Sequence, residues 1–218
     1  MAQIVIIQHR FSAMKKDFKL NLYLVTDTPE RCRYGLLETV RRAVAGGVSI
    51  VQYRRENSDH ATMLAEVLPL RDMLRGAGVP LIINDDVALA VEIDADGIHI
   101  GQDDMPVEQA RALIGPDKIL GLTVTNAVEM AAVNPELVDY VGCGPVFPTI
   151  SKDDAPAELG VQKWGELAAT CPVPICAIGG LNVERARAVR ATGHCNGIAV
   201  VSAICAAEDP EQAARELA

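Results

Sequence analysis

Two acidic pairs, Asp85-Asp86 and Asp103-Asp104, are the residues of this sequence best suited to bind a divalent metal ion. Each pair directly follows a short apolar run, so we expect both pairs at the ends of neighbouring strands. Mg²⁺ is usually held by one or two carboxylates together with phosphate oxygens, so the pairs predict a metal ion bound with a phosphorylated substrate. Taken singly, each acid is also explained as a solvated loop residue or a helix cap, above all Asp103-Asp104 before Pro106.

Residues suited to phosphate binding follow three later apolar runs. Thr149, Ser151 and Lys152 lie in one loop, and Gly179-Gly180 and Val201-Ser202 follow the next two runs. Glycine turns let backbone amides approach a phosphate, and a lysine with two hydroxyl groups can hold an anion. A single loop lysine or glycine pair is more often plain surface or a tight turn, so only the combination favours a phosphate site.

A third set of polar residues lies within and just after the second apolar run. Gln52, Arg54 and Glu56 alternate along an extended chain and are therefore expected on one side of it. Asn84 and Thr123 end two further runs. These side chains predict a polar substrate site where the strands end.

Eight short apolar runs alternate with eight helical patterns and must position these residues. The predicted strands are Leu22–Thr26, Ile50–Arg54, Leu81–Asn84, Gly97–Ile100, Ile119–Val124, Tyr140–Gly144, Ile175–Ile178 and Gly197–Val201. The predicted helices are Leu36–Ala45, Ala61–Leu74, Val87–Ile93, Val107–Ile114, Ala127–Val133, Val161–Ala169, Val183–Ala191 and Glu211–Leu217. Continuous apolar runs indicate parallel strands buried on both faces.

This alternation predicts an α/β protein consisting of a single (β/α)₈ TIM barrel over residues 20–218. An open doubly wound sheet is the alternative, but the first strand is not followed by a nucleotide-binding glycine turn. Residues 1–19 form an N-terminal extension that packs near the bottom of the barrel or is partly disordered. Trp164 and Tyr140 are interpreted as packing residues, and His99 as packed or hydrogen-bonded within the barrel wall.

Composition excludes several classes of function. A net charge of −9 argues against a nucleic-acid partner, because a phosphate backbone requires a basic face. The six cysteines show no CxxC pair, which favours free thiols in a cytoplasmic protein. No run is long enough for a membrane span or a secretion signal. The predicted partners are small molecules, and a homo-oligomer is compatible with the sequence.

Five stretches, VQYRREN, INDDVALAVEIDADGIHIGQDDMP, GPVFPTISKDD, AIGGL and GIAVVSAI, resemble the thiamine phosphate synthase family over about residues 20–205. The resemblance implies a transferase that joins hydroxymethylpyrimidine diphosphate to thiazole phosphate and releases diphosphate. It implies Mg²⁺ on Asp85 and Asp104, and diphosphate held by Gln52, Arg54, Asn84 and Lys152. It also implies that Thr149 and Ser151 border the thiazole and that Gly180, Val201 and Ser202 bind its phosphate, with Lys152, Thr123 and Arg54 serving catalysis.

The sequence departs from this family at three positions. Glu56 stands where lysine is usual, Thr123 where serine is usual, and Thr125 where histidine is common, notably in the related thiazole tautomerases. The loss of that histidine argues against a tautomerase. Glu56 leaves two alternatives open, which are a divergent relative with tautomerase-like or other activity and a non-catalytic binder of thiazole or thiamine phosphate.

Overall fold

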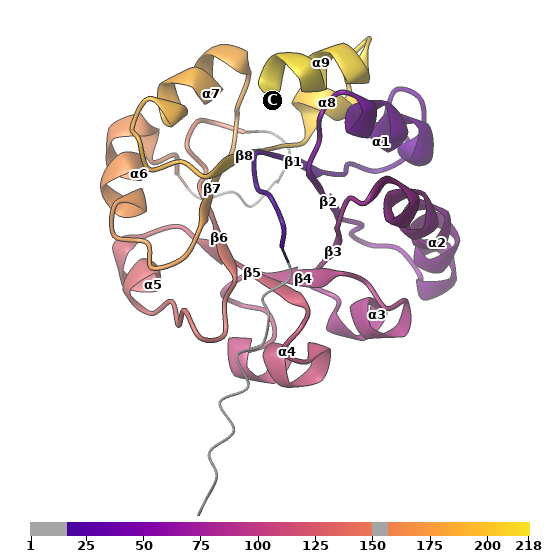
Figure 1. The fold of residues 1–218 in the computed structure, drawn as a ribbon, viewed down its shortest axis with the longest axis horizontal. Coiled ribbons are helices and arrows are strands. Elements are labelled where there is room, and N and C mark those ends of the chain that lie inside the picture. Colours follow the sequence, from indigo (N-terminus) through magenta and orange to yellow (C-terminus); the bar gives the residue numbers. More distant parts are fainter. Residues whose placement is uncertain (1–16, 150–156) are drawn as a thin grey trace, which may run out of the picture.

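The computed structural model describes residues 17–149 and 157–218. Its eight strands form one closed, all-parallel barrel in the order of the sequence, with helices around the outside (Figure 1). The strands are β1 (Leu22–Val25), β2 (Ile50–Tyr53), β3 (Leu81–Asn84), β4 (Gly97–Ile100), β5 (Ile119–Val124), β6 (Tyr140–Cys143), β7 (Ile175–Ile178) and β8 (Gly197–Val200). The predicted TIM barrel is therefore confirmed, and the predicted strands differ only in that β1, β2, β6 and β8 end one residue earlier.

Each helix predicted from the sequence is present in the described residues, and the structure adds one short helix. The helices are α1 (Leu36–Ala45), α2 (His60–Ala77), α3 (Val87–Glu92), α4 (Val107–Ile114), α5 (Ala127–Ala131), α6 (Gly160–Ala168), α7 (Val183–Arg190), α8 (Ser202–Cys205) and α9 (Pro210–Leu217). The short helix α8 was not predicted, because four residues are too few to show a helical period. It begins directly after β8, where TIM barrels frequently have an extra helix near a phosphate site.

Capping residues explain where several helices begin and end. The Asp59 side chain accepts a hydrogen bond from the Thr62 amide at the start of α2, and Asn182 caps α7 in the same way. Gly46 and Gly115 follow α1 and α4 as C-caps. The chemistry of such caps is local to one turn of the chain.

The apolar core has two layers, separated by the strands. One layer fills the space between strands and helices and contains Trp164, whose ring nitrogen donates to the carbonyl of Cys143 at 3.1 Å. The other layer fills the barrel lumen and contains Tyr23 and Tyr140. Phe18, just before β1, lies edge-on to Tyr140 with ring centroids 5.9 Å apart, so this end of the predicted extension closes the bottom of the lumen.

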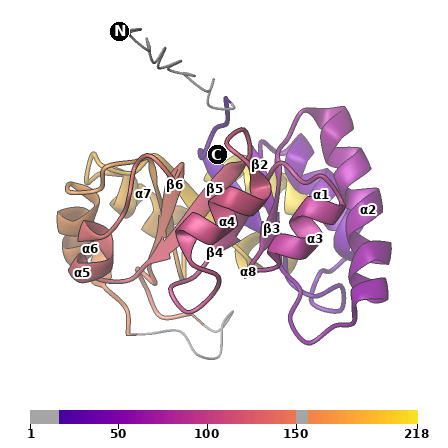
Figure 2. The same cartoon turned by 90° about the horizontal axis from the view of Figure 1, so that it is seen from below.

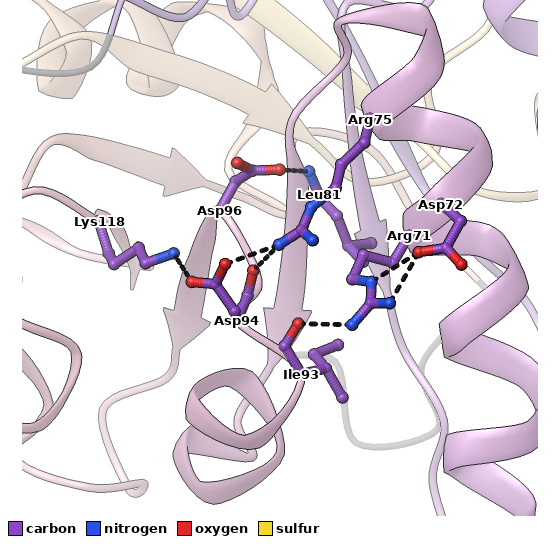
Figure 3. Close-up of polar contacts among 8 residues, drawn as sticks. All are labelled: Arg71, Asp72, Arg75, Leu81, Ile93, Asp94, Asp96 and Lys118. Carbon is purple, nitrogen blue, oxygen red and sulfur yellow. Dashed lines mark hydrogen bonds and ion pairs between the residues drawn. The ribbon is translucent and has the colours of Figure 1, made fainter.

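Charged side chains join neighbouring elements at the N-terminal ends of β3 to β5 (Figure 3). Asp94 accepts from Arg75 of α2 at 2.8 Å and from Lys118 at 2.5 Å. Asp96 accepts from the backbone amide of Leu81 at 2.9 Å. These acids hold the connection between α3 and β4 in place, so they serve the fold at the end of the barrel remote from the strand exits.

No helix within residues 17–149 and 157–218 is both long and apolar enough to cross a membrane. All six cysteines are free thiols, as predicted.

Candidate active site

The polar residues singled out in the sequence and described by the structure lie at the carboxyl ends of the strands. Figure 2 shows this end of the barrel, marked by α8, opposite the segment that enters β1. In TIM barrels the loops at this end carry the active site, because the side chains that end eight strands face one mouth there. Ser151 and Lys152 lie outside the described residues, so their predicted roles stay predictions.

The exit of β2 has the alternation predicted for Gln52, Arg54 and Glu56. Gln52 faces the lumen and is only 4% exposed, whereas Arg54 lies above it, nearer the mouth. The Arg54 guanidinium donates to the Glu56 carboxylate at 3.0 Å, and its backbone amide donates to the Thr26 hydroxyl at 3.0 Å. The unusual carboxylate at position 56 thus forms an ion pair with the arginine expected to bind diphosphate.

Arg55 faces away from this pair. Its guanidinium lies 3.5 Å from the Glu30 carboxylate and 3.6 Å from the Glu66 carboxylate. With its guanidinium beside these two acids, Arg55 does not take the place of the missing lysine. The charge change at Glu56 is therefore not offset by its neighbour in the sequence.

The ends of β3 and β4 bring the predicted metal residues onto adjacent strands. The Asn84 amide donates to the Asp85 carboxylate at 2.5 Å, and the Asp85 backbone amide donates to the carbonyl of His99 at 2.9 Å. Asp85 has a φ of 60°, a left-handed conformation that is strained for a residue other than glycine. Strain of this kind collects at functional sites, where surrounding contacts impose it.

Helix capping accounts for one of these acids and not for another. Asp86 caps α3 by accepting from the Leu89 amide at 2.9 Å, so the capping alternative is right for Asp86. Asp104 instead accepts from the Gly101 amide at 2.6 Å, and the N-cap of α4 is Pro106, with no side-chain cap. The capping alternative is therefore wrong for Asp104, whose carboxylate folds over its own loop.

A metal site of protein ligands alone is absent from the described ranges, which hold no cluster of three or more His, Cys, Asp or Glu residues suited to a metal ion. Asp85 and Asp104 are two carboxylates on neighbouring strand ends, with the Asn84 amide beside them. Such an oxygen-only set suits Mg²⁺, which completes its shell with water and substrate oxygens.

The exit of β5 contains two of the departures from the family pattern. The Thr123 hydroxyl lies 2.9 Å from Nε2 of His99, and the Gln102 amide donates to the Thr123 carbonyl at 2.6 Å. Thr125 donates both its amide, at 2.6 Å, and its hydroxyl, at 2.9 Å, to the Glu129 carboxylate in the first turn of α5. Thr125 thus stabilises a helix start, whereas Thr123 faces the lumen.

A polar chain below the mouth contains Tyr23, which was not singled out in the sequence, and Tyr140, which was interpreted as a packing residue. It also contains His99, which was expected to be packed or hydrogen-bonded within the barrel wall. Tyr23 and Tyr140 share a hydrogen bond of 2.7 Å, and His99 Nδ1 lies 2.9 Å from the Tyr140 hydroxyl. Burial lowers the pKa of His99 to about 4, so the ring is neutral near pH 7. Burial also raises the pKa values of Tyr23 and Tyr140 well above the usual range, so both stay protonated.

The loops after β6 and β7 pack tightly on each other. The Phe147 amide donates to the Gly179 carbonyl at 3.1 Å. A Cβ atom on Gly180 would lie 2.3 Å from the Pro148 carbonyl oxygen, and Gly180 has a φ of 61°. Glycine is therefore required at position 180 for the approach of the loop that carries Thr149.

Arg185 of α7 joins the same two loops and was not predicted from the sequence. It donates to the Gly180 carbonyl at 2.6 Å, and its guanidinium lies 4.7 Å from the centre of the Phe147 ring. Beside these loops, Val201 is the N-cap of α8 and Ser202 is its first residue. The first amides of a helix have no partner within it, so this turn can donate to an anion.

Several known proteins are similar to this chain over most of its length. The chain is 48% identical over 204 residues to the thiamine-phosphate synthase of Azorhizobium caulinodans, covering 94% of this chain and 96% of that protein. It is 44% identical to the corresponding Chloroflexus aurantiacus protein, covering 90% of each chain.

A solved structure of similar fold and sequence is also that of an enzyme of thiamine phosphate synthesis. The thiamine phosphate pyrophosphorylase of Pyrococcus furiosus superposes with a TM-score of 0.81 at 35% identity, covering 91% of this chain and 93% of that one. The family model described as thiamine monophosphate synthase matches residues 22–204, which include all eight strands and the first three residues of α8. The chain belongs to the thiamine monophosphate synthase family.

Proposed function

We propose that this protein joins hydroxymethylpyrimidine diphosphate to thiazole phosphate, forming thiamine phosphate and releasing diphosphate. The observation that carries the proposal is the family match over the whole barrel, with Arg54, Asn84, Asp85 and Asp104 at the strand ends where TIM barrels act. The proposed partners are these small molecules. The free thiols further support an enzyme that works in the cytoplasm.

The reaction needs no protein nucleophile. The bond between the pyrimidine methylene carbon and the diphosphate oxygen breaks, and its electron pair leaves with diphosphate. The thiazole nitrogen contributes its lone pair to the new bond at the same methylene carbon. The aminopyrimidine ring spreads the positive charge that develops on the methylene, so the protein has to stabilise the departing charge and orient the two substrates.

The diphosphate would be held on the β2 to β4 side of the mouth. Arg54 and Asn84 supply hydrogen-bond donors there, and the family resemblance adds Lys152. Asp85 and Asp104 would hold Mg²⁺, which neutralises diphosphate charge and makes it a better leaving group. The strained backbone of Asp85 and the fold of Asp104 over Gly101 support this role, because neither is explained by helix capping.

The thiazole phosphate would bind on the opposite side of the mouth. Thr149 and Ser151 would border the ring, and backbone donors at Gly180, Val201 and Ser202 would receive the phosphate. The packing of the two loops around Gly180 and the start of α8 at Ser202 support this placement. Thr125 provides no basic side chain at the position where histidine is common in the thiazole tautomerases, and its hydroxyl donates to Glu129.

A test of the proposal measures thiamine phosphate formation with and without Mg²⁺, using neighbouring aspartates as a matched pair. Asp85→Asn and Asp104→Asn remove one metal-binding charge each, and turnover should fall by about 100-fold, or about 2.7 kcal/mol of transition-state stabilisation. Asp86→Asn is the control, because asparagine caps a helix as well as aspartate does.

Full activity of the Asp85 and Asp104 variants, or activity unaffected by EDTA, would remove Mg²⁺ from the proposal. If the wild-type protein forms no thiamine phosphate from the two substrates with Mg²⁺, the synthase proposal fails. A divergent activity or simple binding of thiazole or thiamine phosphate then takes its place.

A further inference from the structure

A single chain of hydrogen bonds crosses the barrel lumen from β2 to β5. Gln52 Nε2 donates to the Tyr23 hydroxyl at 2.9 Å, and this hydroxyl lies 2.7 Å from that of Tyr140. The Tyr140 hydroxyl lies 2.9 Å from His99 Nδ1, and His99 Nε2 lies 2.9 Å from the Thr123 hydroxyl. All but Thr123 are buried, and none of the five side chains is an acid, a lysine or an arginine.

The lumen is shaped around the two central rings. A Cβ atom on Gly121 would lie 2.2 Å from Cζ of Tyr140 and 2.4 Å from Nδ1 of His99. A Cβ atom on Gly142 would lie 3.1 Å from Cε1 of His99. A larger residue at either position would therefore crowd these rings, so the two glycines leave the room that His99 and Tyr140 occupy.

One order of donors and acceptors gives every buried hydroxyl proton in this chain an acceptor. Tyr23 accepts from Gln52, so its single hydroxyl proton is available to Tyr140. Tyr140 then donates to His99 Nδ1, which leaves the proton of a neutral ring on Nε2. Nε2 donates to Thr123, so the Thr123 hydroxyl proton is directed elsewhere.

The two ends of the chain therefore present opposite hydrogen-bonding groups. Thr123, which is half-buried at the end of β5, presents a proton donor. One N–H of the Gln52 amide donates to Tyr23, which fixes the orientation of the amide and leaves its carbonyl oxygen as an acceptor beside the second N–H. Reversal of this pattern requires every proton in the chain to move and the Gln52 amide to rotate.

We propose that Tyr23, Tyr140 and His99 are positioning residues that fix Thr123 as a donor and Gln52 as an acceptor for the ring of the pyrimidine substrate. The inference rests on the proposed function for the identity of that ring. A 4-aminopyrimidine has lone pairs on its ring nitrogens and N–H groups on its amino substituent, which matches a donor and an acceptor. A 4-oxo ring carries N–H on the ring and accepts at oxygen, so it presents the reverse pattern.

The first experiment measures the His99 tautomer in the free protein by ¹⁵N NMR with labelled histidine. The chain predicts a proton on Nε2 and a lone pair on Nδ1. Tyr140→Phe removes the hydroxyl and keeps the ring, and Tyr23→Phe interrupts the chain one step earlier. Both variants should populate the two tautomers together, and Tyr23→Phe covers the case in which the Tyr140 variant folds poorly.

Tyr53→Phe is the matched control. Tyr53 is a buried tyrosine of β2 whose hydroxyl donates to Glu66 at 2.7 Å, outside the lumen. This variant loses one tyrosine hydrogen bond as the others do, but the His99 tautomer should stay unchanged.

The second experiment compares binding of the 4-aminopyrimidine diphosphate with that of its 4-oxo analogue by calorimetry. Wild-type protein and Tyr53→Phe should favour the amino compound by at least about tenfold, because a site built for one pattern leaves its polar groups unpaired with the other. Tyr140→Phe and Tyr23→Phe should lose most of this selectivity.

Two results would overturn the inference. One is a proton on Nδ1 of His99 in the wild-type protein. The other is equal selectivity in Tyr140→Phe, Tyr23→Phe and Tyr53→Phe, which would give the chain a purely structural role. Failure of the proposed function is distinguishable from both, since the wild-type protein would then bind neither pyrimidine whatever the tautomer of His99.

Discussion

Glu56, which stands where the family pattern has lysine, forms an ion pair with Arg54, another residue of the predicted site. Its carboxylate is 59% exposed, yet it holds the guanidinium of Arg54, which is only 16% exposed. Diphosphate must therefore compete with Glu56 for Arg54 and approach a carboxylate where lysine is usual. Arg55 offers no compensation, because it pairs with Glu30 and Glu66 on the outer side.

Glu56→Lys introduces the lysine that is usual in the family at this position. It should lower the KM for pyrimidine diphosphate by about tenfold or more, since a hydrogen bond between charged groups contributes about 1.5–3 kcal/mol. Steady-state kinetics with each substrate varied in turn measure the effect, and the KM for thiazole phosphate should stay constant. Glu136→Lys makes the same charge change before β6, at the far end of the barrel, and should have no such effect. Equal effects of the two variants would attribute the change to net charge alone.

Buried His99 should make the stability of the protein depend on pH. Its folded pKa of about 4 lies below the unfolded value of about 6.5, so the unfolded chain binds more protons between these values. Stability therefore falls as the pH falls through this window, by about 2 kcal/mol between about pH 7.5 and pH 5. Urea unfolding of wild-type protein and His99→Phe at both pH values isolates this contribution. The variant should be less stable at both, but without this additional loss, and a parallel loss in the two proteins would contradict the prediction.

The loops after β6 and β7 form one unit, although the sequence places them in separate βα repeats. Backbone hydrogen bonds join Val146 to Ile178 and Phe147 to Gly179, and Arg185 donates to Gly180. A change in one loop is therefore expected to move the other, and with it the residues proposed to border the thiazole phosphate.

Gly180→Ala places a Cβ atom against the backbone of this loop and should raise the KM for thiazole phosphate far more than that for pyrimidine diphosphate. The left-handed conformation also costs about 1–2 kcal/mol of stability. Gly193→Ala is the control for strain alone, because Gly193 has a φ of 80° with no atom within 4 Å of its Cβ position. It should lose similar stability with unchanged kinetics. An equal rise in both KM values for Gly180→Ala would indicate general damage instead.

The molecule as a whole divides its polar residues between the two ends of the barrel. At the N-terminal end of the strands, the charged groups form many mutual contacts that join one βα unit to the next. The Arg111 guanidinium of α4 donates to the carbonyls of Gly115, Lys118 and Leu137 and to the Asp139 carboxylate at 2.7 Å. At the other end, Arg54 pairs with Glu56, and Asp104 accepts from Gly101 within its own loop.

Arg111→Ala should therefore lower the free energy of unfolding by about 3 kcal/mol, since it removes one donor from a half-buried acid and from each of three carbonyls. Its kcat and KM, measured well below the unfolding transition, should match those of the wild-type protein. Arg187→Ala, at an exposed position of α7, is the control and should change neither quantity. A large loss of kcat in Arg111→Ala would show that the two ends of the barrel are not independent.

The sequence by itself determined the barrel and most of the polar positions at its mouth. Strands buried on both faces must be apolar throughout, so their order and limits are visible in the chain, and strand alternation places Gln52, Arg54 and Glu56 on one side. Capping chemistry is equally local, as at Asp59 and Asn182, which each cap the helix that follows them.

Only the tertiary structure decided which polar groups meet across the barrel. Tyr23 and Tyr140 are 117 residues apart in the chain, and a period of two tells which side of a strand a residue faces but not what lies opposite. The same holds for His99 of β4, which meets Tyr140 of β6 and Thr123 of β5. Hydrogen bonds act over about 3 Å and in fixed directions, so they are decided only when the strands have closed into a barrel.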